Sequence, residues 1–452
     1  MRLLSKQGMP PPPSRALSGT VEDLLNTVFE LRGSVLSGAF IVRSGILHIV
    51  VSLVFVQGFA YIAQLVLARL VSASAFGVIR GTESVLGIGT LLAACGMPSL
   101  IVKYTAEVED LAVQGRILIR LLHITLISSA VTASMLYLLG PMLVSAESAV
   151  FLRRLVVIVC VTACGRTCLN YLQGARKFQL FSVLSAIASL SAFGLLMAQV
   201  TSWGLNGWVL ARYTGEALFL AAGLWGSRHA LWAANTPDDA PLLGGSSSAV
   251  WLIGVTLSSS LLVRTALDNV AILSLSRVAA SADVGRFGLA AVICAATLVI
   301  PAAIGAAAFP RLARARNKGD GVERIFFLAV AAIVLATTLI AACLVAGAPF
   351  ISIVFGAEYK ESVSLLRILS LASPFRGLTS LCGTLLLVYN EAPLTLKINA
   401  LLLMVAVPVF FVAARRYGAT GVACCTLALE VAAAAGYMRH ALLTLDKSAA
   451  AA

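Results

Sequence analysis

The sequence predicts an all-α membrane protein with about twelve transmembrane helices arranged in two six-helix lobes. Three observations predict this fold class: the composition, the spacing of the apolar segments and an internal repeat. Of the 452 residues 60% are hydrophobic and only 12% are charged, and the mean hydropathy is +0.96. A soluble domain carries about 25% charged residues. A spanning helix needs about 20 apolar residues, and with its connection it takes about 37 residues of chain. The 452 residues therefore hold roughly twelve spans and leave no room for a sizeable soluble catalytic domain.

The first 44 residues differ from the rest of the chain. They contain four consecutive prolines, Pro10 to Pro13, and acidic residues that interrupt any apolar run, which excludes a cleaved signal peptide. Apolar residues recur at helical spacing behind Thr20 and Asp23, whose spacing is that of a capping box. Residues 1–44 are therefore predicted to be a cytoplasmic N-terminal segment with an amphipathic helix on the membrane surface.

Apolar segments with short polar breaks fill the remainder of the chain. They predict transmembrane helices at 45–69, 77–103, 116–144, 153–175, 178–202, 205–228, 248–276, 284–312, 324–346, 362–388, 394–414 and 419–442. The longest polar break, 229–247, divides six helices from six and predicts a cytoplasmic linker. The N-lobe then comprises residues 45–228, the C-lobe comprises residues 248–442, and residues 443–452 form a cytoplasmic tail.

The distribution of cations predicts the orientation in the membrane. The formal net charge is +13. With a cytoplasmic N-terminus, 20 of the 33 Lys and Arg residues fall on the inner side and nine on the outer side, in agreement with the positive-inside bias. Both termini are therefore predicted to be cytoplasmic. The inner cations are scattered over seven separate segments, which argues against nucleic acid as a partner.

An internal repeat relates the two lobes. The segment Ser72–Val78 follows the first helix, and the similar segment Ser281–Leu289 follows the seventh. A better match joins the openings of helices six and twelve, Trp203-Gly204-Leu205-Asn206-Gly207 and Tyr417-Gly418-Ala419-Thr420-Gly421. At the same offset Glu216 corresponds to Glu430. Six helices per repeat is an even number, so the repeats are predicted to be parallel, as an alternating-access transporter requires.

An ionisable residue near the centre of a span raises the free energy of membrane insertion by about 2.5–3.5 kcal/mol, so each one indicates a structural or functional role. The sequence places eight within the spans: Arg80, Glu83, Arg212, Glu216, Arg264, Asp268, Arg376 and Glu430. Three pairs are spaced for a shared helix face, and in one interpretation they neutralise each other and hold helices together. Arg376 has no acid within four positions, and it is predicted to be unpaired and to face water or an anion.

These charges therefore fall into two predicted groups. A guanidinium suits phosphate binding, so the candidates for a cationic substrate-binding cavity are Arg376, Arg264 and Arg80. Structural or coupling roles are predicted for Glu83, Arg212, Glu216, Asp268 and Glu430. Hydroxyl and amide residues of the seventh helix support a wet cavity: Thr256, Ser258, Ser259, Ser260, Thr265 and Asn269.

Catalytic and nucleotide-binding motifs are absent from the sequence. It contains no P-loop, no zinc-protease motif, no nucleophile elbow and no Cys/His metal spacing. The sequence thus predicts a transporter rather than an enzyme, without a cofactor or metal, driven by a gradient of H+ or Na+ or by substrate flux.

Four segments resemble bacterial oligosaccharide flippases. Leu67–Ser72 with Phe76-Gly77 resembles their "ARLLGPEEFG" stretch, although Ser72-Ala73-Ser74-Ala75 stands in place of the Pro-containing part. Tyr171–Phe178 resembles "LQGLGRF", Phe355–Tyr359 resembles "FGEEY", and Tyr417–Ala423 resembles "YGAxGAA". The matches occur in the same order along the chain, whereas the first 44 residues have no counterpart.

This resemblance is to the polysaccharide biosynthesis branch of the multidrug/oligosaccharidyl-lipid/polysaccharide (MOP) exporter superfamily, which includes the MATE transporters. It implies two lobes around a V-shaped central cavity and a flippase that moves undecaprenyl-diphosphate-linked oligosaccharide across the bacterial inner membrane. It also implies a cationic cavity, for which Arg264 and Arg376 lie in suitable helices. The expected partners are the lipid-linked glycan, membrane lipids and other polysaccharide assembly proteins, and the chain is expected to be a monomer.

Two other functions remain open at this stage. A multidrug or organic-cation exporter of the same superfamily would have a site rich in acids and aromatic residues, whereas only 7% of residues here are aromatic. A membrane polysaccharide polymerase or acyltransferase would need a long extramembrane loop, and the longest loop here is 229–247.

Overall fold

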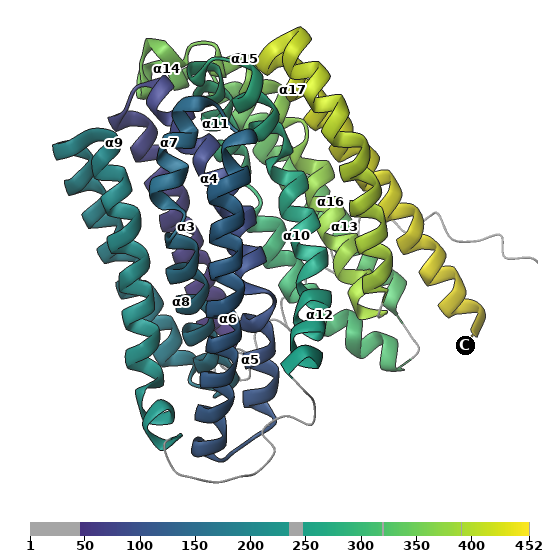
Figure 1. Ribbon diagram of the computed structural model, residues 1–452. Coiled ribbons are helices and arrows are strands. Elements are labelled where there is room, and N and C mark those ends of the chain that lie inside the picture. Colours follow the sequence, from purple (N-terminus) through teal and green to yellow (C-terminus); the bar gives the residue numbers. More distant parts are fainter. Residues whose placement is uncertain (1–45, 235–246, 319–320, 390, 452) are drawn as a thin grey trace, which may run out of the picture. The chain divides into compact units, whose positions relative to one another are not determined.

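The computed structural model describes residues 46–234, 247–318, 321–389 and 391–451 (Figure 1). Apart from the first four residues of the first helix, everything described below lies in the unit formed by residues 50–452. The predicted N-terminal segment at 1–44 and residues 235–246 of the predicted linker lie outside the described residues. Within the described part the secondary structure is helical without any strand, which confirms the predicted all-α fold class.

The two halves of the chain contain similar successions of helices, and the second half has one additional short helix, α14 (Phe350–Phe355). The first half comprises α3 (Ile46–Leu70), α4 (Ala73–Ala94), α5 (Met97–Ala106), α6 (Leu111–Leu139), η1 (Gly140–Met142), α7 (Ala146–Leu155), α8 (Ile158–Gly174) and α9 (Phe178–Ala233). The second comprises α10 (Ser247–Val278), α11 (Ser281–Ala296), α12 (Val299–Lys318), α13 (Val322–Gly347), α14 (Phe350–Phe355), η2 (Ala357–Tyr359), α15 (Ser362–Ser370), α16 (Ser373–Val388) and α17 (Ala392–Ala451).

The breaks between helices also correspond. A broken second span appears as α4–α5 in one half and α11–α12 in the other, and a bent fourth span appears as α7–α8 (51°) and α15–α16 (40°). The predicted spans 77–103 and 284–312 are therefore each two helices. In the first case Cys95 and Gly96 both adopt positive φ, and Pro98 lies in the first turn of α5, where proline is well tolerated.

Each half ends in a very long helix that folds back on itself at a repeat glycine. Gly204 has φ 55° and ψ −130°, and Gly418 has φ 60° and ψ −147°. These angles are near those of the first central residue of a type II′ turn, where glycine is strongly preferred. A Cβ on Gly215 would lie 3.3 Å from the Ala192 Cβ, so the two arms of α9 pack against each other. The glycine that the two repeats share thus stands, in both halves, at the point where the chain reverses its direction.

Several helices are long and apolar enough to cross a membrane. Among the described residues five such stretches occur, and the two bent pairs bring the number to seven: Ala73–Ala106, Leu111–Met142, Phe178–Ala233, Val322–Gly347, Pro393–Lys447, and the pairs α7–α8 and α15–α16. The 56 residues of α9 would extend about 84 Å as one straight helix, so α9 and α17 each supply two spans. With α3, α10 and α11–α12, each half then contains six spans, as predicted.

The two halves contact each other through α4, which packs against α10 and α11, and through α5, which packs against α10. The closest approach joins the two repeated segments, because a Cβ on Gly77 would overlap the backbone of Ser281 and one on Gly285 would overlap that of Ala73. Only glycine permits backbones to approach this closely. Gly77 therefore allows the backbones of the two halves to pack directly against each other.

Polar contacts join the halves at the same end. The Ala73 amide donates to the Glu358 carboxylate (2.9 Å), which lies between α14 and α15, and the Ser281 hydroxyl donates to Glu147 of α7 (2.7 Å). Arg69 donates to the carbonyl oxygen of Val354. Thus a carboxylate from the second half caps a helix of the first.

Three buried apolar clusters form the core. One contains residues of both halves and lies at the end that holds the glycine reversals, with Phe76, Trp208 and Val422 among its members. The other two are built around Leu118 of α6 in the first half and around Leu385 of α16 in the second. The largest of the three clusters therefore joins the two halves, while the other two lie mainly within one half each.

Candidate functional site

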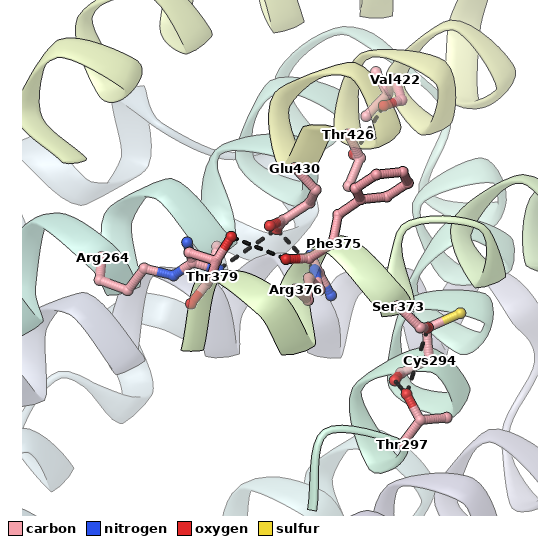
Figure 2. Close-up of polar contacts among 11 residues, drawn as sticks. Arg264, Cys294, Thr297, Ser373, Phe375, Arg376, Thr379, Val422, Thr426 and Glu430 are labelled. Atoms are coloured by element: carbon pink, nitrogen blue, oxygen red, sulfur yellow. Dashed lines mark hydrogen bonds and ion pairs between the residues drawn. The ribbon is translucent and has the colours of Figure 1, made fainter. Parts of the chain in front are cut away.

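Four charged side chains meet in the second half of the chain. Arg264 and Asp268 lie one turn apart on α10, Arg376 lies on α16, and Glu430 lies on the second arm of α17. Arg264 Nη2 is 3.0 Å from Asp268 Oδ1 and 3.5 Å from Glu430 Oε1. Arg376 Nε donates to the same Glu430 oxygen over 2.7 Å. Figure 2 shows Glu430 between the two arginines.

The prediction that Arg376 is unpaired is wrong. Its partner, Glu430, lies 54 positions away in sequence and comes from a different helix. The Glu430 side chain is only 4% exposed, and a buried carboxylate requires a cation nearby. The pairing of Arg264 with Asp268 at i,i+4 is as the sequence predicts. The side chains of Arg376 and Arg264 remain 18% and 26% exposed, so both arginines also reach a cavity.

A corresponding cluster lies in the first half. Arg212 Nη1 is 3.2 Å from Glu216 Oε1, one turn away on α9, and Arg212 Nε is 3.8 Å from Glu83 Oε1 on α4. Arg80 Nη1 is 3.7 Å from Glu83 Oε2 and donates to Gln64 Oε1 over 2.7 Å. All four predicted charges of this half are thus joined, and the predicted pairs Arg80/Glu83 and Arg212/Glu216 form.

Sequence reasoning missed Gln64. Its amide nitrogen donates to Glu83 Oε2 (3.5 Å) while its oxygen accepts from Arg80, so it bridges the acid and the base. The available signal was an amide side chain within the largely apolar segment 45–69, where an unpartnered polar group is costly.

The acids at the repeat positions have different partners in the two halves. Glu216 takes its counter-ion from Arg212, one turn earlier on the same helix. The residue that corresponds to Arg212 is Thr426, whose hydroxyl donates to the Val422 carbonyl (2.9 Å) within α17. Glu430 therefore depends on cations from other helices. The repeat preserves the position of the acid but not the source of its neutralising charge.

Two cavities adjoin these clusters. The first-half cavity, of about 180 Å³, is lined by Glu83, Arg212 and Glu216 together with apolar and amide side chains. The arginine cavity, of about 290 Å³, lies between the halves and is lined by residues of both. Its charged lining residues are Arg80, Arg264, Asp268, Arg376 and Glu430. The structure thus brings together the three arginines that the sequence nominated for substrate binding.

The two cavities differ in the sign of their net charge. Two glutamates and one arginine give the first-half cavity a formal net charge of −1. Three arginines against Asp268 and Glu430 give the arginine cavity a formal net charge of +1. Arg80 and Glu83 pair over 3.7 Å but line different cavities, so an incoming ion meets the arginine of this pair in one cavity and the carboxylate in the other.

The long apolar helices and their arrangement are those of a multi-pass membrane protein. The sequence model described as "Polysaccharide biosynthesis protein" matches residues 42–316, which is more than half of the chain. The chain belongs to this family. No curated protein sequence matches it significantly.

Solved structures agree on the fold. An inward-facing multidrug resistance MATE transporter of the MOP superfamily is similar over 86% of this chain and 94% of its own, with a TM-score of 0.68 and 15% identity. The lipid II flippase MurJ, in an inward closed conformation, is similar over 85% and 86% (TM-score 0.65, 12% identity). A MOP superfamily transporter from Pyrococcus furiosus is similar over 89% and 96% (TM-score 0.60, 14% identity). At these identities the likeness concerns the fold.

Proposed function

We propose that the protein is a flippase that translocates undecaprenyl-diphosphate-linked oligosaccharide across the bacterial inner membrane by alternating access, for surface polysaccharide biosynthesis. The observation that carries this proposal is the convergence of Arg80, Arg264 and Arg376 on one cavity with a net positive charge. A diphosphate is dianionic or more, and guanidinium groups bind phosphate oxygens through two parallel hydrogen bonds. In this proposal the headgroup enters the arginine cavity while the lipid tail stays in the bilayer.

The arginines are held in place by acids that an anion can displace. Glu430 and Asp268 neutralise Arg264 and Arg376 over 2.7–3.5 Å. A diphosphate competes for the same guanidinium faces. Binding would therefore exchange protein ion pairs for substrate ion pairs, and this exchange changes the contacts among α10, α16 and α17. Such a differential contact between two states is what coupling to a conformational change requires.

We further propose that the first-half cavity takes the coupling cation, H+ or Na+. Glu216 pairs with Arg212, and the carboxylate charge of Glu83 is shared between Arg212 (3.8 Å) and Arg80 (3.7 Å). Glu83→Gln would remove that charge. Translocation by this variant should then lose its dependence on the gradient, measured in inverted membrane vesicles with a proton ionophore and, separately, with Na+ replaced by choline.

In this proposal both termini are cytoplasmic, the protein works as a monomer, and other polysaccharide assembly proteins act on the product. Deletion of the gene in its host tests the main function. We expect loss of surface polysaccharide and accumulation of the undecaprenyl-diphosphate-linked glycan, measured by lipid extraction and mass spectrometry. Intact surface polysaccharide without any accumulated intermediate would refute the proposal.

The alternative function is export of organic cations, since the similar MATE structure is that of a multidrug resistance transporter. The net positive charge of the arginine cavity opposes it, because a cationic drug would be repelled there. Drug-susceptibility assays on an overexpressing strain separate the two functions. Increased resistance to cationic drugs, with unchanged lipid-linked intermediates after gene deletion, would favour the alternative.

A further inference from the structure

A third cavity lies wholly within the second half of the chain. It has a volume of about 640 Å³ and is enclosed by α10, α12, α16 and the two arms of α17, and its volume is within the range of small-molecule sites. We call it the hydroxyl cavity, after the side chains Ser260, Thr379, Ser380, Thr384 and Thr395 in its lining. Neither the charge clusters nor the family assignment gives it a role.

The lining of this cavity is rich in hydrogen-bond acceptors. Thr379 Oγ1 donates its hydrogen to the Phe375 carbonyl (2.9 Å), and Thr384 Oγ1 donates to the Ser380 carbonyl (3.0 Å). A helix hydroxyl bonded in this way has only its lone pairs left for other partners. Asp268, whose side chain is 44% exposed, adds a carboxylate. The lining therefore suits a ligand with many hydroxyl donors.

Asn399 provides an independent sign that points to a ligand with donor groups. It lines the cavity and is only 3% exposed, and its side chain hydrogen-bonds Tyr437. Its Oδ1 atom has no hydrogen-bond partner in the described part of the chain. Buried amide oxygens are nearly always paired because an unpaired one is costly. The Oδ1 atom is covered in this structure, so a donor in the cavity would relieve this cost after a rotation of the Asn399 side chain.

The hydroxyl cavity adjoins the arginine cavity. Arg264, Asp268 and Arg376 line both. A ligand with an anionic group joined to a sugar can therefore place its anion at the arginines and its hydroxyls against Thr379, Thr384 and Asn399. Tyr437, a buried side chain, lines the same space.

From this arrangement we infer that the hydroxyl cavity is a binding subsite for sugar hydroxyls of the transported lipid-linked glycan, next to a diphosphate subsite at Arg264 and Arg376. The inference rests on the proposed flippase function and goes beyond it, because it assigns glycan recognition to the second half alone. Specificity for the glycan then comes from neutral acceptors rather than from the arginines.

Gly383 allows a test with little risk to folding. A Cβ added there would lie 3.5 Å from Tyr437 Cε1, an ordinary contact distance, and Gly383 lines the cavity. Gly383→Ala thus adds a methyl group inside the subsite without a clash. The matched control is Gly436→Ala on α17, whose Cβ would lie 3.9 Å from Ile398 Cγ2 and which does not line the cavity. Asn399→Leu is a second test variant, since it removes the unpaired acceptor at similar volume.

The assay measures binding of two lipids to the full-length protein in nanodiscs. The probes are undecaprenyl diphosphate and the undecaprenyl-diphosphate-linked glycan isolated from cells that lack the gene. We expect Gly383→Ala and Asn399→Leu to weaken binding of the glycan-bearing lipid about tenfold, to leave undecaprenyl diphosphate binding unchanged, and to accumulate lipid-linked glycan in cells. Gly436→Ala should match the wild type.

Each remaining outcome overturns a defined claim. Unchanged binding of both lipids by Gly383→Ala and Asn399→Leu refutes the sugar subsite and leaves the flippase function standing. An equal loss for both lipids also refutes it, because the fault would then lie at the arginines. If no glycan-bearing lipid accumulates in the deletion strain, or if the wild type binds neither lipid, the proposed function itself fails.

Discussion

The pairing of Arg376 with Glu430 predicts strong coupling between substitutions at the two positions. Arg376→Met leaves the Glu430 carboxylate, 4% exposed, without its 2.7 Å partner. Removal of one member of a buried ion pair costs about 3–5 kcal/mol, whereas removal of both costs far less. Because Arg264 Nη2 remains 3.5 Å from the same oxygen, we expect the lower end, about 3 kcal/mol, for Arg376→Met.

The double variant Arg376→Met/Glu430→Gln should recover about 2 kcal/mol relative to the sum of the single variants, a coupling energy within the range for residues in direct contact. The assay is reversible unfolding in mixed detergent micelles, followed by tryptophan fluorescence, with the double-mutant cycle evaluated from the four free energies. Arg264 Nη2 also contacts Glu430 Oε1, so the cycle measures the coupling of Arg376 with Glu430 in the presence of Arg264. Additivity within about 0.5 kcal/mol would refute the ion pair.

The same double variant separates stability from transport. It restores the charge balance of the cluster but removes one guanidinium from the arginine cavity. We expect the folded double variant to accumulate lipid-linked glycan in cells. Normal translocation by a folded protein of this kind would remove Arg376 from the substrate site.

Three further predictions concern the backbone and the contact between the halves. Gly204→Ala and Gly418→Ala should each lower the free energy of unfolding by about 1–3 kcal/mol, because both glycines hold a conformation that an L-residue rarely adopts. The detergent unfolding assay measures this change. An unchanged unfolding midpoint would contradict the chain reversal at these two glycines. Gly77→Ala should destabilise the protein in the same assay and speed proteolysis at the interface, since its Cβ would overlap the opposite backbone; wild-type values would contradict the close approach. Glu358→Ala should accelerate hydrogen exchange at the Ala73 amide, which it caps over 2.9 Å, and an unchanged exchange rate would exclude this bond.

Features carried by local sequence were predictable. The apolar segments follow from composition over about 20 residues, and the pairs at i,i+3 and i,i+4 follow from helix geometry. The glycines of the repeat were recognisable by their common offset, and the structure adds their backbone angles. The breaks at Cys95 and at Thr297 were not predicted, because a helix that is apolar on both sides of a break shows no change in hydropathy there.

Features that depend on packing between distant helices were not predictable. Arg376 was expected to be unpaired because only neighbours within four positions were visible, whereas its acid comes from another helix. Gln64 passed unnoticed for the same reason, since its function depends on side chains 16 and 19 positions away. The hydroxyl cavity gave only a weak signal, Ser260, because serine and threonine also serve helix packing.

The position of Arg264 and Arg376 beside the cavity between the halves follows from a difference between the repeats. Both halves keep an acid at the same position, Glu216 and Glu430, but only the first half keeps a cation one turn before it. With Thr426 in place of that cation, Glu430 draws Arg264 and Arg376 from α10 and α16. The cations thereby move from the helix that carries the acid to helices that line the cavity between the halves. Arg264 and Arg376 balance Asp268 and Glu430 there, so the excess positive charge of the arginine cavity comes from Arg80 of the first half, whose partner Glu83 lines the other cavity.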